Sequence, residues 1–331
     1  MESKVRISRN ANTPLRRILR TDEMSVIIPL IVIIALTTIV RPDFLTIDNF
    51  SSMFTQIPYI AIIGLAISFP IMTGNIDISV GKTAGFAGVI MSMLCVDYQW
   101  SAGAAILFAL LCGAIIGVFN GILVVHFGVP DFVGTMGTYY MIGGARFLFI
   151  KGYQFSLSGL ENFVLDDVFA ARYLGMPLTF WIMIVLFVVA FIIIKRTLWG
   201  RKILATGDNK DVASLAGINV KNTRMIAYII SGVLAAVAGL LLTLDMALGL
   251  PENGDGWEFR GIAGCVVGGV SLSGGKGSPL GVLLGVTLIF VAESAIIFIG
   301  LPATMRTAVQ GVIMAAAVLY DIFKQQRKIP A

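Results

Sequence analysis

Polar side chains alternate along residues 73–83, between two short apolar segments. Asn75, Asp77 and Ser79 supply an amide, a carboxyl and a hydroxyl group in close succession, and such groups can exchange hydrogen bonds with a polar solute. In a membrane, non-helical backbone is tolerated only where protein buries it or where it lines a watery cavity. We therefore take these three residues as candidates for the lining of a solute pathway. An ordinary turn is the alternative.

A second interruption covers residues 261–277, an apolar run that holds seven glycines together with Ser271 and Ser273. Small residues let helix backbones approach closely in lipid, which explains part of this composition without any function. Three positions align with the first stretch: Ser273, Gly275 and Lys276 with Ser79, Gly81 and Lys82. Paired glycine-interrupted segments in the two halves of a transporter indicate its substrate path. Ser271 and Ser273 are therefore further pathway candidates.

Three ionisable residues lie inside apolar stretches, namely Arg146, Asp245 and Glu293. A charge within the bilayer is costly, so each is a functional candidate by default. Glu293 lies deeper in its segment than Asp245 and joins the pathway candidates. Arg146 could pair with an acid or reach the membrane interface. The single histidine, His126, provides no acid–histidine chain for a proton relay.

Motifs for phosphate binding and hydrolysis are incomplete. Gly81-Lys82-Thr83 resembles the end of a P-loop, but that motif requires a glycine at the position of Ile76. The sequence has no HExxH motif, and its three cysteines show no metal-ligand spacing. We therefore expect no catalytic residue, no metal site and no cofactor in this chain, and we do not expect an enzyme.

The long segment 195–224 is basic and connects two apolar segments. Asp208 and Asn209 can cap the start of a helix and Gly217 can close it, which predicts a short helix over residues 209–216. A short capped helix is suited to docking into a groove of another protein. The expected docking residues are Asp208, Asn209, Lys210, Ala213, Leu215 and Gly217. A connecting loop that is basic only because it is cytoplasmic is the alternative.

Composition places these residues in a membrane protein. The chain has 331 residues, of which 57% are hydrophobic and only 13% are charged, whereas soluble domains carry about 25% charged residues. So few charges cannot form a solvated surface, so lipid must cover much of it. The excess of basic residues lies at the ends of apolar segments, which argues against nucleic-acid binding.

Ten apolar segments are long enough, or nearly long enough, to cross a bilayer. They cover residues 24–40, 57–72, 83–96, 102–125, 132–150, 176–194, 225–249, 259–272, 280–299 and 304–321. We therefore predict an all-α polytopic membrane protein with about ten transmembrane helices. The predicted membrane domain spans residues 24–321, between a basic N-terminus (1–23) and a short C-terminus (322–331).

The distribution of Lys and Arg predicts the orientation of these segments. With both termini, the segment 195–224 and the two glycine-rich turns in the cytoplasm, the cytoplasmic side holds 18 Lys and Arg and the external side five. Positive residues accumulate on the cytoplasmic side of membrane proteins. This assignment places Lys82 in the cytoplasm and Asp255 outside.

The same stretches resemble the permeases of ribose-type monosaccharide ABC importers. Residues 74–81 read Gly-Asn-Ile-Asp-Ile-Ser-Val-Gly, which is similar to the family's Gly-Gly-Ile-Asp-Leu-Ser-Val-Gly. Further similar motifs lie at 130–137, 207–219 and 267–277, in the family's order. Two departures concern the substrate: Arg260 stands where the family commonly has Asp, and Phe147 where it often has Gly.

The resemblance implies a permease subunit in a bacterial inner membrane, which imports a monosaccharide or sugar-like solute delivered by an external binding protein. It also implies a dimer of identical or paralogous permeases and two ATPase subunits, which hold ATP and Mg²⁺ and contact the loop at 200–220. It does not identify the sugar. From the residues alone, an ion-coupled secondary transporter or channel is the alternative, but that class needs several ionisable groups at the midplane.

Overall fold

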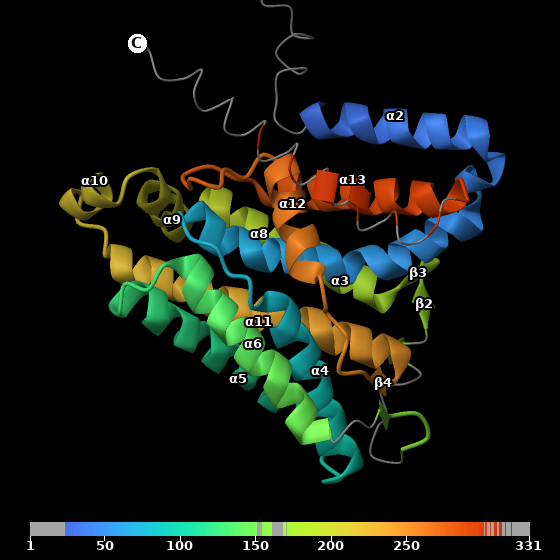
Figure 1. Ribbon diagram of the computed structural model, residues 1–331, viewed down its shortest axis with the longest axis horizontal. Helices are drawn as coiled ribbons and strands as arrows, with labels where there is room; N and C mark the ends of the chain where they lie inside the picture. Colours follow the sequence, from blue (N-terminus) through green and yellow to red (C-terminus); the bar gives the residue numbers. More distant parts are fainter. Residues whose placement is uncertain are drawn as a thin grey trace, which may run out of the picture.

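The computed structural model describes residues 24–150, 154–160, 168–169, 171–300 and isolated positions between 302 and 319. These residues are mostly helical (Figure 1). The α-helices are α2 (Met24–Val40), α3 (Ile47–Met72), α4 (Val80–Val96), α5 (Ala102–Gly121), α6 (Asp131–Ile150), α8 (Leu178–Arg196), α9 (Leu198–Asp208), α10 (Lys210–Leu215), α11 (Val220–Met246), α12 (Trp257–Val267) and α13 (Pro279–Phe298). The all-α fold class is confirmed.

Five of the described helices are long and apolar enough to cross a membrane. They are α3, α8, α11, α13 and the continuous segment Ala102–His126, in which α5 runs into the π-helix η2 (Ile122–His126). Shorter apolar helices cover Val26–Val40 and Val80–Val96. These segments fit a multi-pass membrane protein. The expected segment 304–321 lies largely outside the described residues, and residues 1–23 and 322–331 lie wholly outside them.

Helix α3 is the centre of the fold. It begins ten residues before the expected segment 57–72, because the Thr46 side chain caps it by accepting from Asn49 N and polar residues continue the helix. In its most apolar window, 83% of the residues are buried. Helices α8, α11, α12 and α13 all pack on α3 (Figure 1).

Glycines allow α11 to pack with its backbone against α4 and α5. A Cβ atom at Gly239 would collide with the backbone of Ala84, and one at Gly232 would collide with the backbone of Gly113. Helices α12 and α13 pack in the same way, since a Cβ at Gly285 would collide with the carbonyl oxygen of Gly264. Such small-residue contacts drive helix association in lipid.

The segment 195–224 is more helical than expected. Helix α9 occupies its first half, and α11 begins at Val220 rather than at residue 225. The predicted helix over 209–216 is confirmed as α10, one residue shorter at each end. Asn209 caps it by accepting from Asp211 N and Val212 N, both at 3.0 Å, and Gly217 follows with φ +80°.

Four two-residue strands lie toward the other end of the molecule from α9 and α10 (Figure 1). Strand β1 (Phe155–Ser156) pairs antiparallel with β4 (Leu248–Gly249), and β2 (Arg172–Tyr173) forms a hairpin with β3 (Met176–Pro177). Short 3₁₀ helix η1 (Pro42–Leu45) joins α2 to α3. These elements turn the chain between helices, and Phe44 of η1 and Phe155 of β1 are buried.

Candidate functional site

Asp77 joins three helices through a buried hydrogen-bond cluster. Its Oδ1 accepts from Ser79 N (3.0 Å), Ser79 Oγ (2.7 Å) and Asn120 Nδ2 (3.2 Å), and its Oδ2 accepts from Ser231 Oγ (2.9 Å). The side chain is 1% exposed. We call Asp77, Ser79, Asn120 and Ser231 the Asp77 cluster. It ties the start of α4 to α5 and α11.

Neighbouring helices also bind the rest of the interruption between α3 and α4. Three contacts do this: Arg224 Nε to Asn75 Oδ1 (2.7 Å), Ile76 N to Asp131 Oδ2 (2.7 Å) and Ile78 N to Thr135 Oγ1 (3.2 Å). Non-helical backbone inside a membrane protein needs such partners. The interruption is therefore an ordered connection, here called the joint between α3 and α4, which α6 and α11 hold in place.

The two glycine-rich stretches meet each other and the end of α9. Gly275 N donates to Met72 O at 3.1 Å. Gly207 lies between these two groups, and a Cβ atom there would collide with both. Gly274 in turn approaches Gly207 and Gly74 so closely that its own Cβ would clash. Backbone contact alone therefore connects α9 to both interruptions.

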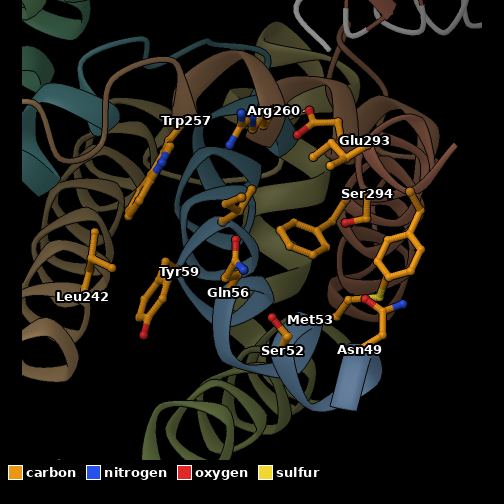
Figure 2. Close-up of a pocket in the computed structure, with 14 residues that line it drawn as sticks. Asn49, Ser52, Met53, Gln56, Tyr59, Leu242, Trp257, Arg260, Glu293 and Ser294 are labelled. Atoms are coloured by element: carbon orange, nitrogen blue, oxygen red, sulfur yellow. Dashed lines mark ion pairs between the residues drawn. The ribbon is translucent and has the colours of Figure 1, made fainter. Parts of the chain in front are cut away.

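A polar cavity of about 310 Å³ opens between α3, α12 and α13 (Figure 2). Its polar lining comprises Asn49, Ser52, Gln56, Tyr59, Arg260, Glu293 and Ser294. Its apolar lining comprises Met53, Ile60, Leu242, Trp257, Phe290, Ile297 and Phe298. The volume lies at the lower end of the range of about 300–1,000 Å³ for small-molecule sites. A mixed lining of this kind fits a small solute with both polar and apolar faces.

An ion pair forms one wall of the cavity. Arg260 Nε on α12 lies 3.3 Å from Glu293 Oε1 on α13, with side-chain exposures of 25% and 5% (Figure 2). On the opposite wall, Tyr59 stacks on Trp257 with ring centroids 6.2 Å apart. Behind Tyr59, Asp245 Oδ2 accepts a hydrogen bond from the phenol at 2.6 Å. Arg260, Glu293 and Asp245 are thus each held by a specific partner.

Sequence comparison identifies the family of the chain that contains this cavity. Residues 49–318 match the family described as the permease component of the branched-chain amino acid transport system. The chain belongs to this permease family. Members of the family are transport components, so the expectation of a permease is confirmed.

Three relatives show which permeases this chain is similar to. The ribose import permease protein RbsC of Haemophilus influenzae is 32% identical over 306 residues, covering 91% of this chain and 94% of the relative. The autoinducer 2 import system permease protein LsrC of Enterobacter sp. is 30% identical over 312 residues (93% and 88%). The L-arabinose ABC transporter permease protein AraH of Azospirillum brasilense is 29% identical over 307 residues (93% and 89%). No solved structure matches.

Of the six pathway candidates in the permease, Glu293 alone lines this cavity. Asn75, Asp77 and Ser79 belong to the joint between α3 and α4, and Ser271 and Ser273 lie in the turn that contains Gly275. Sequence reasoning missed the polar face of α3, formed by Asn49, Ser52, Gln56 and Tyr59. Their spacing of three, four and three residues places them on one side of a helix, a signal that the sequence already contained.

Arg146 of the permease pairs with an acid. Of the two expectations for this residue, pairing with an acid is confirmed. Its Nη2 and Lys82 Nζ both lie 2.7 Å from Asp255 Oδ1. The assignment of Lys82 and Asp255 to opposite membrane faces is therefore wrong for at least one of them, because the two groups touch. The segment before α12 must reach the depth of the first turn of α4.

In the docking segment of the permease, exposure differs sharply along α10. Leu215 is 89% exposed and Val212 is 60% exposed, but Ala213 is only 3% exposed. Ala213 packs against its own chain, so the expectation that it offers a contact surface is corrected. The polar residues Asp208, Asn209 and Lys210 are exposed, as is Gly217.

Proposed function

We propose that this chain is the membrane-spanning permease subunit of an ABC importer, and that it translocates a monosaccharide or sugar-like solute. The observation that carries the proposal is a polar cavity with aromatic walls inside an otherwise apolar helical protein. The named functions of the relatives, which concern ribose, arabinose and autoinducer 2, support it. The cavity would receive the solute from an external binding protein.

Uphill import needs energy from other chains. Two ATPase subunits with bound ATP and Mg²⁺ would supply it, and a second permease, identical or paralogous, would complete the membrane part. A partner shifts a conformational equilibrium only through contacts that differ between the two states. The exposed side of α10, with Leu215 and Val212, offers such contacts.

The junction at Gly207 would carry movement from the docking helix into the membrane. Gly207 closes α9 just before α10 and touches both Met72 and Gly275 without an intervening side chain. The Lys210 side chain also folds back toward Gly74, where partial burial and the charge of Arg224 lower the pKa of its amine. A displacement of α10 would therefore act directly on both glycine-rich interruptions.

The direct test of the proposal is transport by a reconstituted complex. Proteoliposomes that contain the permease, its ATPase and its binding protein should accumulate sugar when ATP is supplied, and not without ATP. An ion-coupled transporter would instead accumulate solute under an ion gradient with no ATPase present. That result would refute the importer and favour the alternative class.

The proposed orientation has ten spans, both termini in the cytoplasm, and α10 on the cytoplasmic side. Cysteines at Lys210 and Leu174, placed in a variant without native cysteines, should react from opposite sides of the membrane. Leu174 is 90% exposed and lies in the turn between β2 and β3. Labelling of position 210 by an impermeant reagent in intact cells would refute this orientation.

Docking can be tested separately from transport. Leu215→Arg places a charge on the exposed side of α10, so recovery of the ATPase with the purified permease should fall at least about tenfold, since an interface charge without a partner costs several kcal/mol. Leu174→Arg is the matched control, an equally exposed leucine on a turn far from α10. Equal recovery with both variants would exclude α10 as the docking element.

A further inference from the structure

A second hollow, of about 270 Å³, opens where the ends of α8 and α9 meet the turn between α12 and α13. In Figure 1 this turn lies beside α9, and a Cβ atom at Gly275 would collide with Asp208, the last residue of α9. The described residues of its lining include two lysines, Lys195 and Lys276, together with Ser278 and the glycines of the turn. We call it the lysine pocket, and no described carboxylate lines it.

The two lysines of this pocket have no counterion on the described chain. Lys195 lies in the last turn of α8 and Lys276 lies in the turn before α13, and both are exposed. Neither amine makes an ion pair or a hydrogen bond with a described residue. Asp208 is exposed to water and lies outside the lining. Two like charges at one pocket repel each other, and an anion between them would remove that repulsion.

The turn adds hydrogen-bond donors that the fold does not use. The backbone N–H groups of Lys276, Gly277 and Ser278 make no hydrogen bond to a described residue, although other N–H groups of the turn do. The Ser278 hydroxyl is buried without a partner, and it does not cap α13, which begins at the next residue. Consecutive unpaired N–H groups and the N-terminus of a helix both bind anions. The turn therefore offers donors beside the two lysines.

The place of the pocket along the helices favours a lipid head group as the anion. Helix α8 is long and apolar enough to cross a membrane, and Lys195 lies at its end, where head groups meet water. Helix α9 follows directly, with Leu198 69% exposed and with Arg201 and Lys202 also exposed. Helices that combine exposed apolar and basic residues lie in the membrane interface. Basic pockets at the cytoplasmic ends of transmembrane helices bind anionic lipid head groups.

We propose that the lysine pocket binds the phosphate group of an anionic phospholipid. Lys195 and Lys276 pair with the phosphate oxygens, and the N–H groups of residues 276–278 donate hydrogen bonds to them. The Ser278 hydroxyl can turn about a single bond and donate another. The pocket is separate from the cavity between α3, α12 and α13, so the proposal goes beyond solute transport. A bound head group would also steady the turn that meets Met72 and the end of α9 at Gly275.

Lipid binding by the purified full-length permease tests the proposal without an ATPase or a solute. The delipidated protein in a neutral detergent is titrated with phosphatidylglycerol or with phosphatidylcholine, and bound lipid is counted by native mass spectrometry. Phosphatidylglycerol should bind more tightly, because the choline head group carries its own cation. Replacing both lysines of the pocket, Lys195→Gln with Lys276→Gln, should weaken phosphatidylglycerol binding on the order of thirtyfold, which is about fivefold for each lysine.

The matched control removes two exposed lysines outside the lining, Lys202→Gln with Lys221→Gln, and should weaken binding far less. Lys195→Arg with Lys276→Arg keeps both charges and should retain binding. Without lipid, the glutamine pair in the pocket should unfold at the same temperature as the unchanged protein, because neither lysine has a partner on the described chain. Phosphatidylglycerol should raise that temperature for the unchanged protein and for the control, but not for the glutamine pair in the pocket.

Competition distinguishes a lipid phosphate from a soluble one. Inorganic phosphate and glycerol phosphate should not displace phosphatidylglycerol at equal concentration, and displacement by either would overturn the lipid assignment in favour of a site for soluble phosphates. Equal binding of the two lipids, or equal weakening by the two lysine pairs, would show general attraction to the surface and overturn the site. ATP-driven uptake is a separate readout, so a failure of the importer proposal would leave the lipid result unchanged.

Discussion

Two of the polar regions among the described helices of the permease, the Asp77 cluster and the cavity, differ in what their polar groups contact. In the Asp77 cluster, four hydrogen bonds from the same chain occupy both carboxyl oxygens. In the cavity, Asn49, Ser52 and Gln56 face an open space of about 310 Å³. The first region is filled by protein, whereas the second is left for something else to fill.

This difference shows that polarity in a membrane segment does not by itself indicate a binding site. Buried polar groups require partners, and the chain can provide them itself to hold an interrupted helix together. A binding region is instead recognised by polar groups whose partners are missing on one side. Mutations should therefore affect the two regions through different measurements: stability in the Asp77 cluster, and solute affinity in the cavity.

The largest effect is expected at Asp77. Asp77→Ala removes the carboxyl acceptor of buried donors on Ser79, Asn120 and Ser231, at about 1–3 kcal/mol for each lost bond; only Asn120 Nδ2 keeps a second acceptor, Ser79 Oγ. Uptake by the reconstituted complex should be abolished, and the thermal midpoint of the purified permease should fall. Asp77→Asn retains the shape and one acceptor oxygen, so it should be intermediate. Normal transport by Asp77→Ala at equal membrane expression would show that the interruption is only a turn.

A smaller effect of a different kind is expected at Gln56. Gln56→Ala removes a polar group that faces the cavity, so the solute concentration for half-maximal uptake should rise about tenfold, which corresponds to roughly 1.4 kcal/mol. The thermal midpoint should not change, because no described residue loses a hydrogen bond. The control is Gln154→Ala, an exposed glutamine outside the cavity. A lower midpoint with unchanged affinity would contradict the assignment of Gln56 to a binding surface.

The smallest effects are expected from a pair of serine variants. Ser231→Ala removes one donor to Asp77 Oδ2 and should destabilise the permease by about 1 kcal/mol, the typical net contribution of one hydrogen bond, without changing solute affinity. Ser294→Ala in the cavity should show the reverse, with a twofold to fivefold weaker affinity (about 0.5–1 kcal/mol) and an unchanged midpoint. Both are read from thermal unfolding and from uptake kinetics. If the two variants behave alike, the distinction between the regions fails.

Much of the fold could be predicted from the sequence, because long apolar segments in a membrane chain have few alternatives to helix. The cap of α10 could also be predicted, since Asn209 and Gly217 act locally. The length of α3 could not be predicted, because its first ten residues include six polar ones, for a reason that is visible only when α12 and α13 pack beside them. Likewise, the sequence indicated that Asp77 is a polar residue in an interrupted helix. It could not indicate that the hydrogen-bond donors come from α5 and α11, because these helices are distant in sequence.

Two expectations failed for a common reason. The exposure of Ala213 depends on how α10 sits on the rest of the chain, and the depth of Asp255 depends on contacts with α4 and α6. Local patterns specify which residues form an element, but they do not specify which side of it meets a neighbour. The polar face of α3 is the exception, because its spacing already indicates a single side.

The glycine contacts described above group the helices into two blocks that should move relative to each other. Helices α4, α5 and α11 touch backbone to backbone, as do α12 and α13, and α3 lies against the second block through Gly64 and Gly261. Within a block the closest contacts involve backbone atoms, which hinders sliding of one helix past another, so each block should move as a rigid body. Nearly all of the cavity lies in the second block, and Leu242 is its contribution from the first. Amide hydrogen exchange should therefore be slowest inside the blocks, and changes during the transport cycle should be concentrated where α11 faces α3.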